Sequence, residues 1–203
     1  MRITKIEHKS GTRYTLYVDE QYFYIFDIEI LETFGIHEGM EVDISLLRKM
    51  KTKAEIRKAR ERAFYLLSYR DYSSQELYQK LCKSVHPKVA AYTIEKMISL
   101  SLINDEAYAQ KLALFYLKQK GWSARKALYE IRRKGIEPEL AKQAIENCHI
   151  APHQQILSLL QTKYASVLRK PNGENKVLQA LARLGFSYAD SKTALAEYYE
   201  SQS

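Results

Sequence analysis

The sequence predicts a mainly α-helical protein, in which three tandem three-helix repeats of about 50 residues form an elongated curved body behind a small β-rich N-terminal module. Two observations carry this prediction. From Ala54 onward, apolar residues recur with helical spacing, whereas the first part of the chain alternates apolar and polar residues. Three related segments also start 50 residues apart: LSYRDYSSQELYQKL at 67–81, LKQKGWSARKALYEI at 117–131 and VLRKPNGENKVLQAL at 167–181.

The N-terminal module, residues 1–47, contains short runs rich in β-branched and aromatic residues. The predicted strands are residues 3–8, 13–18 and 21–26. Asp19 and Glu20 form a polar turn, which favours a hairpin. Residues 28–34 have helical spacing, and residues 41–44 are expected to rejoin the sheet. The tyrosines here invite a nucleic-acid stacking interpretation, but no Lys or Arg is interleaved with them, so ordinary strand packing is favoured.

A basic segment, residues 48–62, enters the first repeat. It reads RKMKTKAEIRKARER, with eight Lys or Arg residues against two Glu residues. Such a run is usually a solvated face or linker, and it is equally suited to lie against DNA phosphate as a basic arm. Both interpretations stay open at this point.

The repeats are expected at residues 48–103 (with the basic segment), 104–150 and 151–203. In the second repeat, Asn104 and Ser123 are predicted N-caps, Gly135 a helix-ending residue and Pro138 a first-turn residue. One unit of about 50 residues is marginally stable alone, so stacked units bury their ends against each other. The stacked units form an extended, curved body, and an extended body suits binding more than catalysis.

In the first repeat, Ser73 and Pro87 occupy the corresponding helix-start positions, and residues 171–173 interrupt the third.

The composition bounds the function. The chain has 203 residues, a net charge of +8 and a pI of about 9.3. Its polar N-terminus and the lack of an apolar run of about 20 residues predict a cytoplasmic protein without a membrane partner. Two cysteines without a C-x-x-C pair fit a reduced compartment, and Cys148, His149 and His153 lack a fourth ligand for a metal. No catalytic motif is found, so we expect no enzyme, no metal and no cofactor.

The candidate partner-binding residues form a basic stripe with interleaved aromatic side chains on the second helix of the second repeat. We define the stripe as Lys118, Lys120, Trp122, Arg125, Lys126, Tyr129, Arg132 and Arg133. Arg70 and Arg183 extend it, because they occupy the same repeat positions as Lys120 and Arg133. Phosphate contact and base stacking need this combination, and an acidic groove on a protein filament would suit it as well. Alternatives are a solvated helix face, a Trp122 that packs between units, and cations that favour helix C-termini.

The order and spacing of three motifs resemble the RecX family of recombination regulators. They are S-x-x-E-L at 73–77, D-x-x-Y-A at 105–109 and R-x-K-G-I at 132–136. The resemblance covers about residues 54–200 and departs at Ser84-Val85 and around 171–173. It implies a protein that is not an enzyme, that lies in the groove of the RecA–DNA filament and that modulates, mostly by inhibition, its ATPase and strand exchange in recombination and DNA repair.

Two other function classes stay open. One is a general nucleic-acid-binding repeat protein that acts on single- or double-stranded DNA without RecA, and the other is a scaffold for an unrelated acidic protein. A monomer is the expected oligomeric state.

Overall fold

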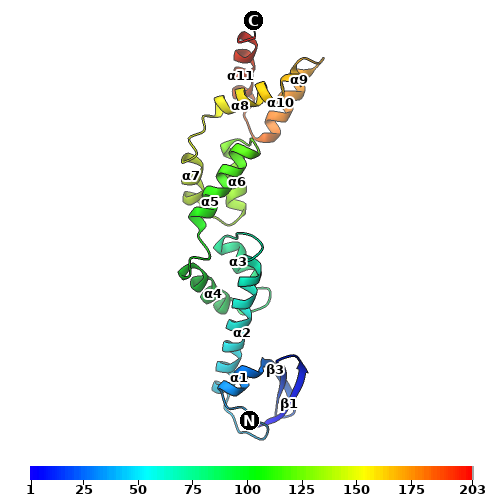
Figure 1. The fold of residues 1–203 in the computed structure, drawn as a ribbon, viewed down its shortest axis with the longest axis vertical. Helices are drawn as coiled ribbons and strands as arrows, with labels where there is room; N and C mark the ends of the chain where they lie inside the picture. The colour runs from blue at the N-terminus through cyan, green and yellow to red at the C-terminus, as the bar shows by residue number, and fades with distance from the viewer. Residues whose placement is uncertain (203) are drawn as a thin grey trace. The chain divides into compact units, whose positions relative to one another are not determined.

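The computed structural model describes residues 1–202, and it confirms a mainly helical chain with a small N-terminal sheet (Figure 1). The residues fall into two compact units. The first unit holds residues 1–70 and 77–102, and the second holds residues 71–76 and those from Ile103 onward. The four-part division of the sequence stays a prediction.

The sheet of the first unit is a three-stranded antiparallel meander in the order β1-β2-β3. Its strands are β1 (Ile3–Ser10), β2 (Arg13–Val18) and β3 (Gln21–Asp27), which confirms the three predicted strands. Asp19 and Glu20 connect β2 to β3 with positive φ angles of 47° and 64°. Two successive residues of positive φ match the twist of the flanking strands, so this is the tight hairpin that the sequence predicts.

The helical segment after β3 is confirmed as α1 (Ile28–Thr33), whereas the strand expected at residues 41–44 is wrong except at one point. Only Glu41 makes a bridge, an isolated one to Arg2. Asp43 instead accepts a hydrogen bond from the Leu46 N–H at 2.7 Å and begins α2 (Ile44–Leu67). The chain turns into a helix here because a side-chain cap is available at once.

The long helix α2 changes its buried face along its length. Leu47, Met50 and Ala54 are buried in the core of the sheet module. Further along, Ala59, Ala63 and Leu66 are buried at positions where α2 packs on α4 (Pro87–Ser99). The basic segment 48–62 therefore lies inside one continuous helix. The helix α3 (Ser74–Leu81) completes the first repeat.

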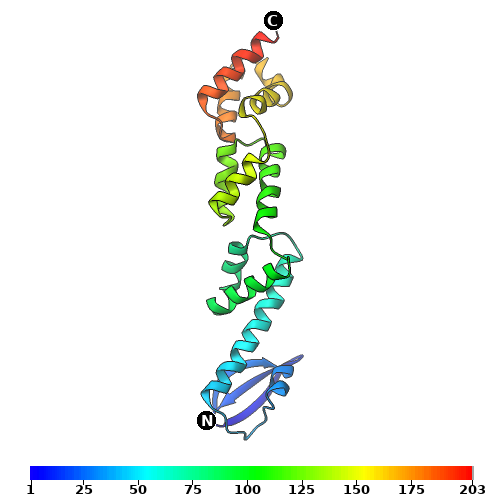
Figure 2. The ribbon, with the colours of Figure 1, turned by 90° about the vertical axis from the view of Figure 1, so that its left-hand side faces the viewer.

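The second unit contains the second and third repeats, which Figure 2 shows from a second direction. Its elements are α5 (Asp105–Leu114), the π-helical turn η1 (Phe115–Gln119), α6 (Ala124–Arg133), α7 (Pro138–Glu146), α8 (Pro152–Thr162), α9 (Ala165–Leu168), α10 (Gly173–Leu184) and α11 (Tyr188–Glu200). The predicted caps are confirmed, because Asn104 accepts from the Ala107 N–H at 2.9 Å and Ser123 from the Lys126 N–H at 3.3 Å. The third repeat adds a short helix, α9, to the three that were expected.

Successive repeats interlock at the ends of their second helices. Ser73 is fully buried; its hydroxyl accepts from the Glu76 N–H at 3.0 Å and donates to the carbonyl of Lys134 at the end of α6. Gly135 follows with φ +78°, and a Cβ on it would lie 2.7 Å from the Cβ of Gln75. Residues 73–76 belong to the second unit, so this contact is internal to it.

The equivalent helix ends meet again 50 residues later, through a backbone bond instead of a hydroxyl bond. The Ser123 N–H donates to the carbonyl of Leu184 at 2.9 Å, and a Cβ on Gly185 would lie 2.5 Å from the Ser123 hydroxyl oxygen. In both places the N-terminus of one helix meets the C-terminus of the equivalent helix of the next repeat. This is a favourable arrangement because free N–H groups face free C=O groups.

Candidate functional site

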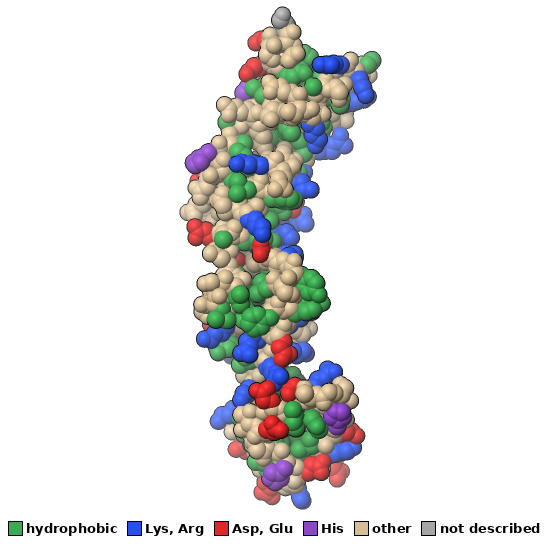
Figure 3. Space-filling model, viewed as in Figure 1, with side chains coloured by type: hydrophobic (Ala, Val, Ile, Leu, Met, Phe, Trp, Pro, Cys, Tyr) green, Lys and Arg blue, Asp and Glu red, His purple; other side chains and the backbone are tan. Residues whose placement is uncertain are grey.

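The helix α6 holds the centre of the predicted stripe and is fixed from within the second unit. Ala127 and Ile131 are fully buried on its inner side, which orients the opposite side outward. Arg125, Tyr129 and Arg132 are exposed there, and Tyr129 retains 62% of its accessible surface. Their spacing of four and three residues places them in one row along the helix. Figure 3 shows Lys and Arg side chains along the right-hand edge over the second unit.

The remaining cations of α6 are engaged within the unit. Arg133 is exposed and pairs with Glu130 at 3.1 Å. The Lys126 Nζ atom donates to the carbonyl oxygen of Arg183 at 2.6 Å. The Lys126 ammonium therefore stabilises the end of α10, where it neutralises a helix C-terminus. This bond ties the side chain to the interlock between the second and third repeats.

Trp122 lies between two side chains of its own unit. Its ring stacks on Tyr116, with centroids 4.7 Å apart and planes at 10°, and the Lys126 Nζ atom lies 4.4 Å from its centroid. Burial raises the pKa of the Tyr116 phenol. Trp122 is therefore half-buried against side chains of its own repeat, and any contact with a partner stays a prediction.

The other predicted residues surround α6 or belong elsewhere. Lys118 and Lys120 are exposed at the π-helical turn, where the Lys120 N–H donates to the carbonyl of Phe115 at 3.0 Å. Arg183 is exposed in the last turn of α10. Arg70 follows α2 in the first unit. The second unit therefore brings all the predicted residues except Arg70 into one compact body.

The basic segment of α2 was not among the predicted binding residues, and its role stays a prediction. It carries eight cations: Arg48, Lys49, Lys51, Lys53, Arg57, Lys58, Arg60 and Arg62. Arg57 pairs with Asp27, Glu29 and Glu61. Within residues 1–202 the other seven form no ion pair. The signal was present in the sequence as an excess of basic residues, but only the structure shows that one cation takes up the nearby carboxylates.

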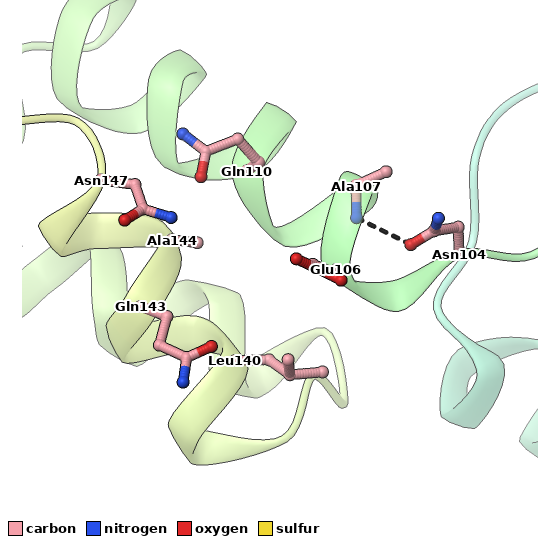
Figure 4. Close-up of a pocket in the computed structure, with 8 residues that line it drawn as sticks. All are labelled: Asn104, Glu106, Ala107, Gln110, Leu140, Gln143, Ala144 and Asn147. Atoms are coloured by element: carbon pink, nitrogen blue, oxygen red, sulfur yellow. Dashed lines mark hydrogen bonds between the residues drawn. The ribbon is translucent and has the colours of Figure 1, made fainter.

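One cavity of the second unit is an open groove of about 380 Å³ between α5 and α7. Figure 4 shows its lining residues: Asn104, Glu106, Ala107, Gln110, Leu140, Gln143, Ala144 and Asn147. Carboxamides dominate this lining, which includes no nucleophile beside a base. Within the described chain, no three His, Cys, Asp or Glu side chains gather where they could hold a metal ion.

Family comparisons match the two helical repeats in turn. The model of the first three-helix domain of RecX matches residues 59–97, and that of the second three-helix domain of RecX matches residues 104–145. A relative from Caldanaerobacter subterraneus subsp. tengcongensis, "Regulatory protein RecX", is 25% identical over 96% of this chain and 98% of its own. These matches support a RecX family protein.

Two further comparisons agree with this similarity. A regulatory protein RecX from Bacillus velezensis is 29% identical over 70% of this chain, and the matched part is 56% of that protein's length. A crystal structure of regulatory protein RecX has the same fold, with a TM-score of 0.63 over 96% of this chain and 98% of that chain, at 23% identity. RecX is a family of regulatory proteins rather than of enzymes. Within residues 1–202, no helix has the length and apolar character needed to cross a bilayer.

Proposed function

We propose that this protein binds the RecA–DNA filament through the outward face of α6 and inhibits the ATPase and strand exchange of the filament. The row Arg125, Tyr129 and Arg132 is the observation that supports this most directly. It is exposed, and neither arginine forms an ion pair within the described residues. Two unneutralised guanidinium groups beside an aromatic ring favour an anionic partner, since such groups recognise carboxylate and phosphate alike.

The mechanism is steric and electrostatic. The cationic face lies across neighbouring RecA protomers and hinders the movements that couple ATP turnover to strand exchange, or it blocks filament growth. The chain needs no catalytic group for this, because it acts on another protein's ATPase. A cytoplasmic monomer without a cofactor fits this role.

The test is DNA-dependent ATP hydrolysis by RecA of the same organism, measured with this protein at substoichiometric ratio. We expect suppression by the unaltered chain. The double variant Arg125→Glu/Arg132→Glu should need at least about tenfold more protein for the same suppression, because reversed charges repel an anionic surface. Its matched control is Arg169→Glu/Lys176→Glu, which makes the same charge change at exposed positions of the third repeat.

Equal loss in both double variants would mean that net charge alone matters and would contradict a site on α6. No suppression by the unaltered chain, together with tight and salt-sensitive binding to bare DNA, would favour the general nucleic-acid-binding function instead.

A further inference from the structure

The second half of α2 and the turn that follows it carry a row of side chains that the proposed function does not use. The row is Lys58, Arg62 and Tyr65 in α2 and Tyr69 just after the helix, at steps of four, three and four residues. The steps within α2 place the first three side chains on one side of the helix, and the Tyr69 ring contacts the Tyr65 ring. Tyr65 and Tyr69 are the most informative members, since they keep 52% and 71% of their surface exposed.

The two tyrosine rings lie at a steep angle to each other, and their hydroxyl groups are in contact. Their centroids lie 4.9 Å apart with planes at 64°, and the Tyr69 hydroxyl donates to the Tyr65 hydroxyl at 3.2 Å. This hydrogen bond raises the pKa of Tyr69. The Arg62 guanidinium lies 5.1 Å from the Tyr65 ring centroid. The rings are thus fixed by local contacts while the face of Tyr69 remains available to a partner.

The charge along the row is one-sided. Arg62 forms no ion pair in the described chain, and Lys58 reaches only the carbonyl of Ser84, at 3.4 Å. Glu61, the carboxylate next to Arg62 in the sequence of α2, is bound to Arg57 at 3.0 Å. A partner therefore meets cations and aromatic faces without a competing negative group on this part of α2.

We infer that the row Lys58, Arg62, Tyr65 and Tyr69 binds single-stranded nucleic acid directly, without RecA. Cations contact the phosphates while unstacked bases stack on the tyrosine rings, which is how sequence-tolerant single-strand sites work. Duplex DNA fits less well, because its bases are already stacked on one another and offer no free face.

The experiment measures fluorescence anisotropy of labelled twelve-nucleotide oligothymidine and of a twelve-base-pair duplex with the full chain. The double variant Tyr65→Leu/Tyr69→Leu should bind the single strand about tenfold or more weakly and the duplex within about twofold of the unaltered chain. Phe64→Leu is the matched aromatic control, because Phe64 is 44% exposed on a different side of the same helix. It should change neither affinity.

A second pair of variants tests the phosphate contact. Arg62→Gln should lower the slope of log affinity against log salt by about 0.7, the value for one phosphate contact on a single strand. Arg60→Gln removes the same charge two residues away, on the other side of α2, and should leave the slope unchanged. Oligouridine in place of oligothymidine shows whether RNA or DNA is the preferred strand, and binding of either supports the site.

A measurement without variants guards against local misfolding. Oligonucleotides with 5-bromodeoxyuridine should photo-crosslink to Tyr65 or Tyr69, as mapped by mass spectrometry. Crosslinks confined to other residues would overturn the proposal, as would an unchanged single-strand affinity in the double variant or an equal loss for the duplex. Binding of polyglutamate that depends on the two tyrosines, while oligothymidine binding does not, would assign the row to an acidic protein and would also overturn it.

Discussion

The interlock at Ser73 offers a sharp test of how the repeats hold together. In Ser73→Ala the Glu76 N–H loses its cap and the Lys134 carbonyl loses the hydroxyl that donates to it. The side chain is fully buried, so water does not replace either bond without rearrangement. Loss of an N-cap costs about 1 kcal/mol, and an unsatisfied buried carbonyl costs about 1–3 kcal/mol. We therefore expect a loss of about 2–4 kcal/mol in the free energy of unfolding.

The assay follows urea unfolding by fluorescence of Trp122, which is the single tryptophan of the chain and lies in the second unit. It therefore reports the unit that contains the interlock. The control is Ser187→Ala. The Ser187 hydroxyl caps α11 by accepting from the Asp190 N–H at 3.0 Å and donates to the Asp190 carboxylate at 2.6 Å, so both bonds stay at the start of its own helix. That variant should lose only about 1 kcal/mol.

Comparing Ser73→Ala with Ser187→Ala shows whether the bond between repeats stabilises the fold. If Ser73→Ala loses no more than Ser187→Ala, the bond between repeats contributes nothing measurable, and the interlock is only a close approach of two helix ends. A larger loss with an unchanged urea dependence assigns the difference to the contact between repeats.

Three further outcomes are expected. Gly185→Ala should lower the free energy of unfolding by about 2 kcal/mol or more, because the position has a positive φ and the added Cβ would crowd Ser123. Gly35→Ala also has a positive φ but no neighbour at the Cβ position, so it should lose about 1 kcal/mol; urea unfolding measures both. Gln155→Leu removes two bonds to carbonyls near the π-helical turn, at 2.8 and 3.1 Å, and should lose about 2 kcal/mol by the same assay. Burial raises the pKa of Cys148, so less of its thiol is ionised at pH 8 in the folded chain. In a variant that lacks the other cysteine, its reaction with a disulfide reagent should therefore be slower in the folded than in the urea-unfolded chain. Equal rates would contradict this.

Local chemistry explains what the sequence could predict of the fold. Asn104 and Ser123 act as caps, and Pro87 and Pro138 lie in first turns, because these features need only neighbours a few residues away. The strand expected at residues 41–44 was wrong because a local feature decided the structure there as well. Residues 41–44 alternate polar and apolar residues, which fits a short strand or a helix start, and the cap that Asp43 provides favours the helix.

The candidate site was predictable in outline and not in detail. Helical phase alone placed Arg125, Tyr129 and Arg132 on an outer face, where the structure has them. It could not show that Lys126 reaches a carbonyl 57 residues away, since that contact depends on the packing of two repeats. A contact between residues this far apart in the chain leaves no repeating pattern in a single sequence.

The change of buried face along α2 has a mechanical consequence for the first unit. One continuous helix of 24 residues provides core residues to the sheet module in its first half and to the helical repeat in its second half. No hinge separates the two, because an unbroken α-helix resists twisting and bending through its ladder of hydrogen bonds. A molecule that binds the sheet and rotates it would therefore rotate Tyr65, and Tyr69 just after the helix, with it. Limited proteolysis should find no cleavable linker between the strands and the first repeat.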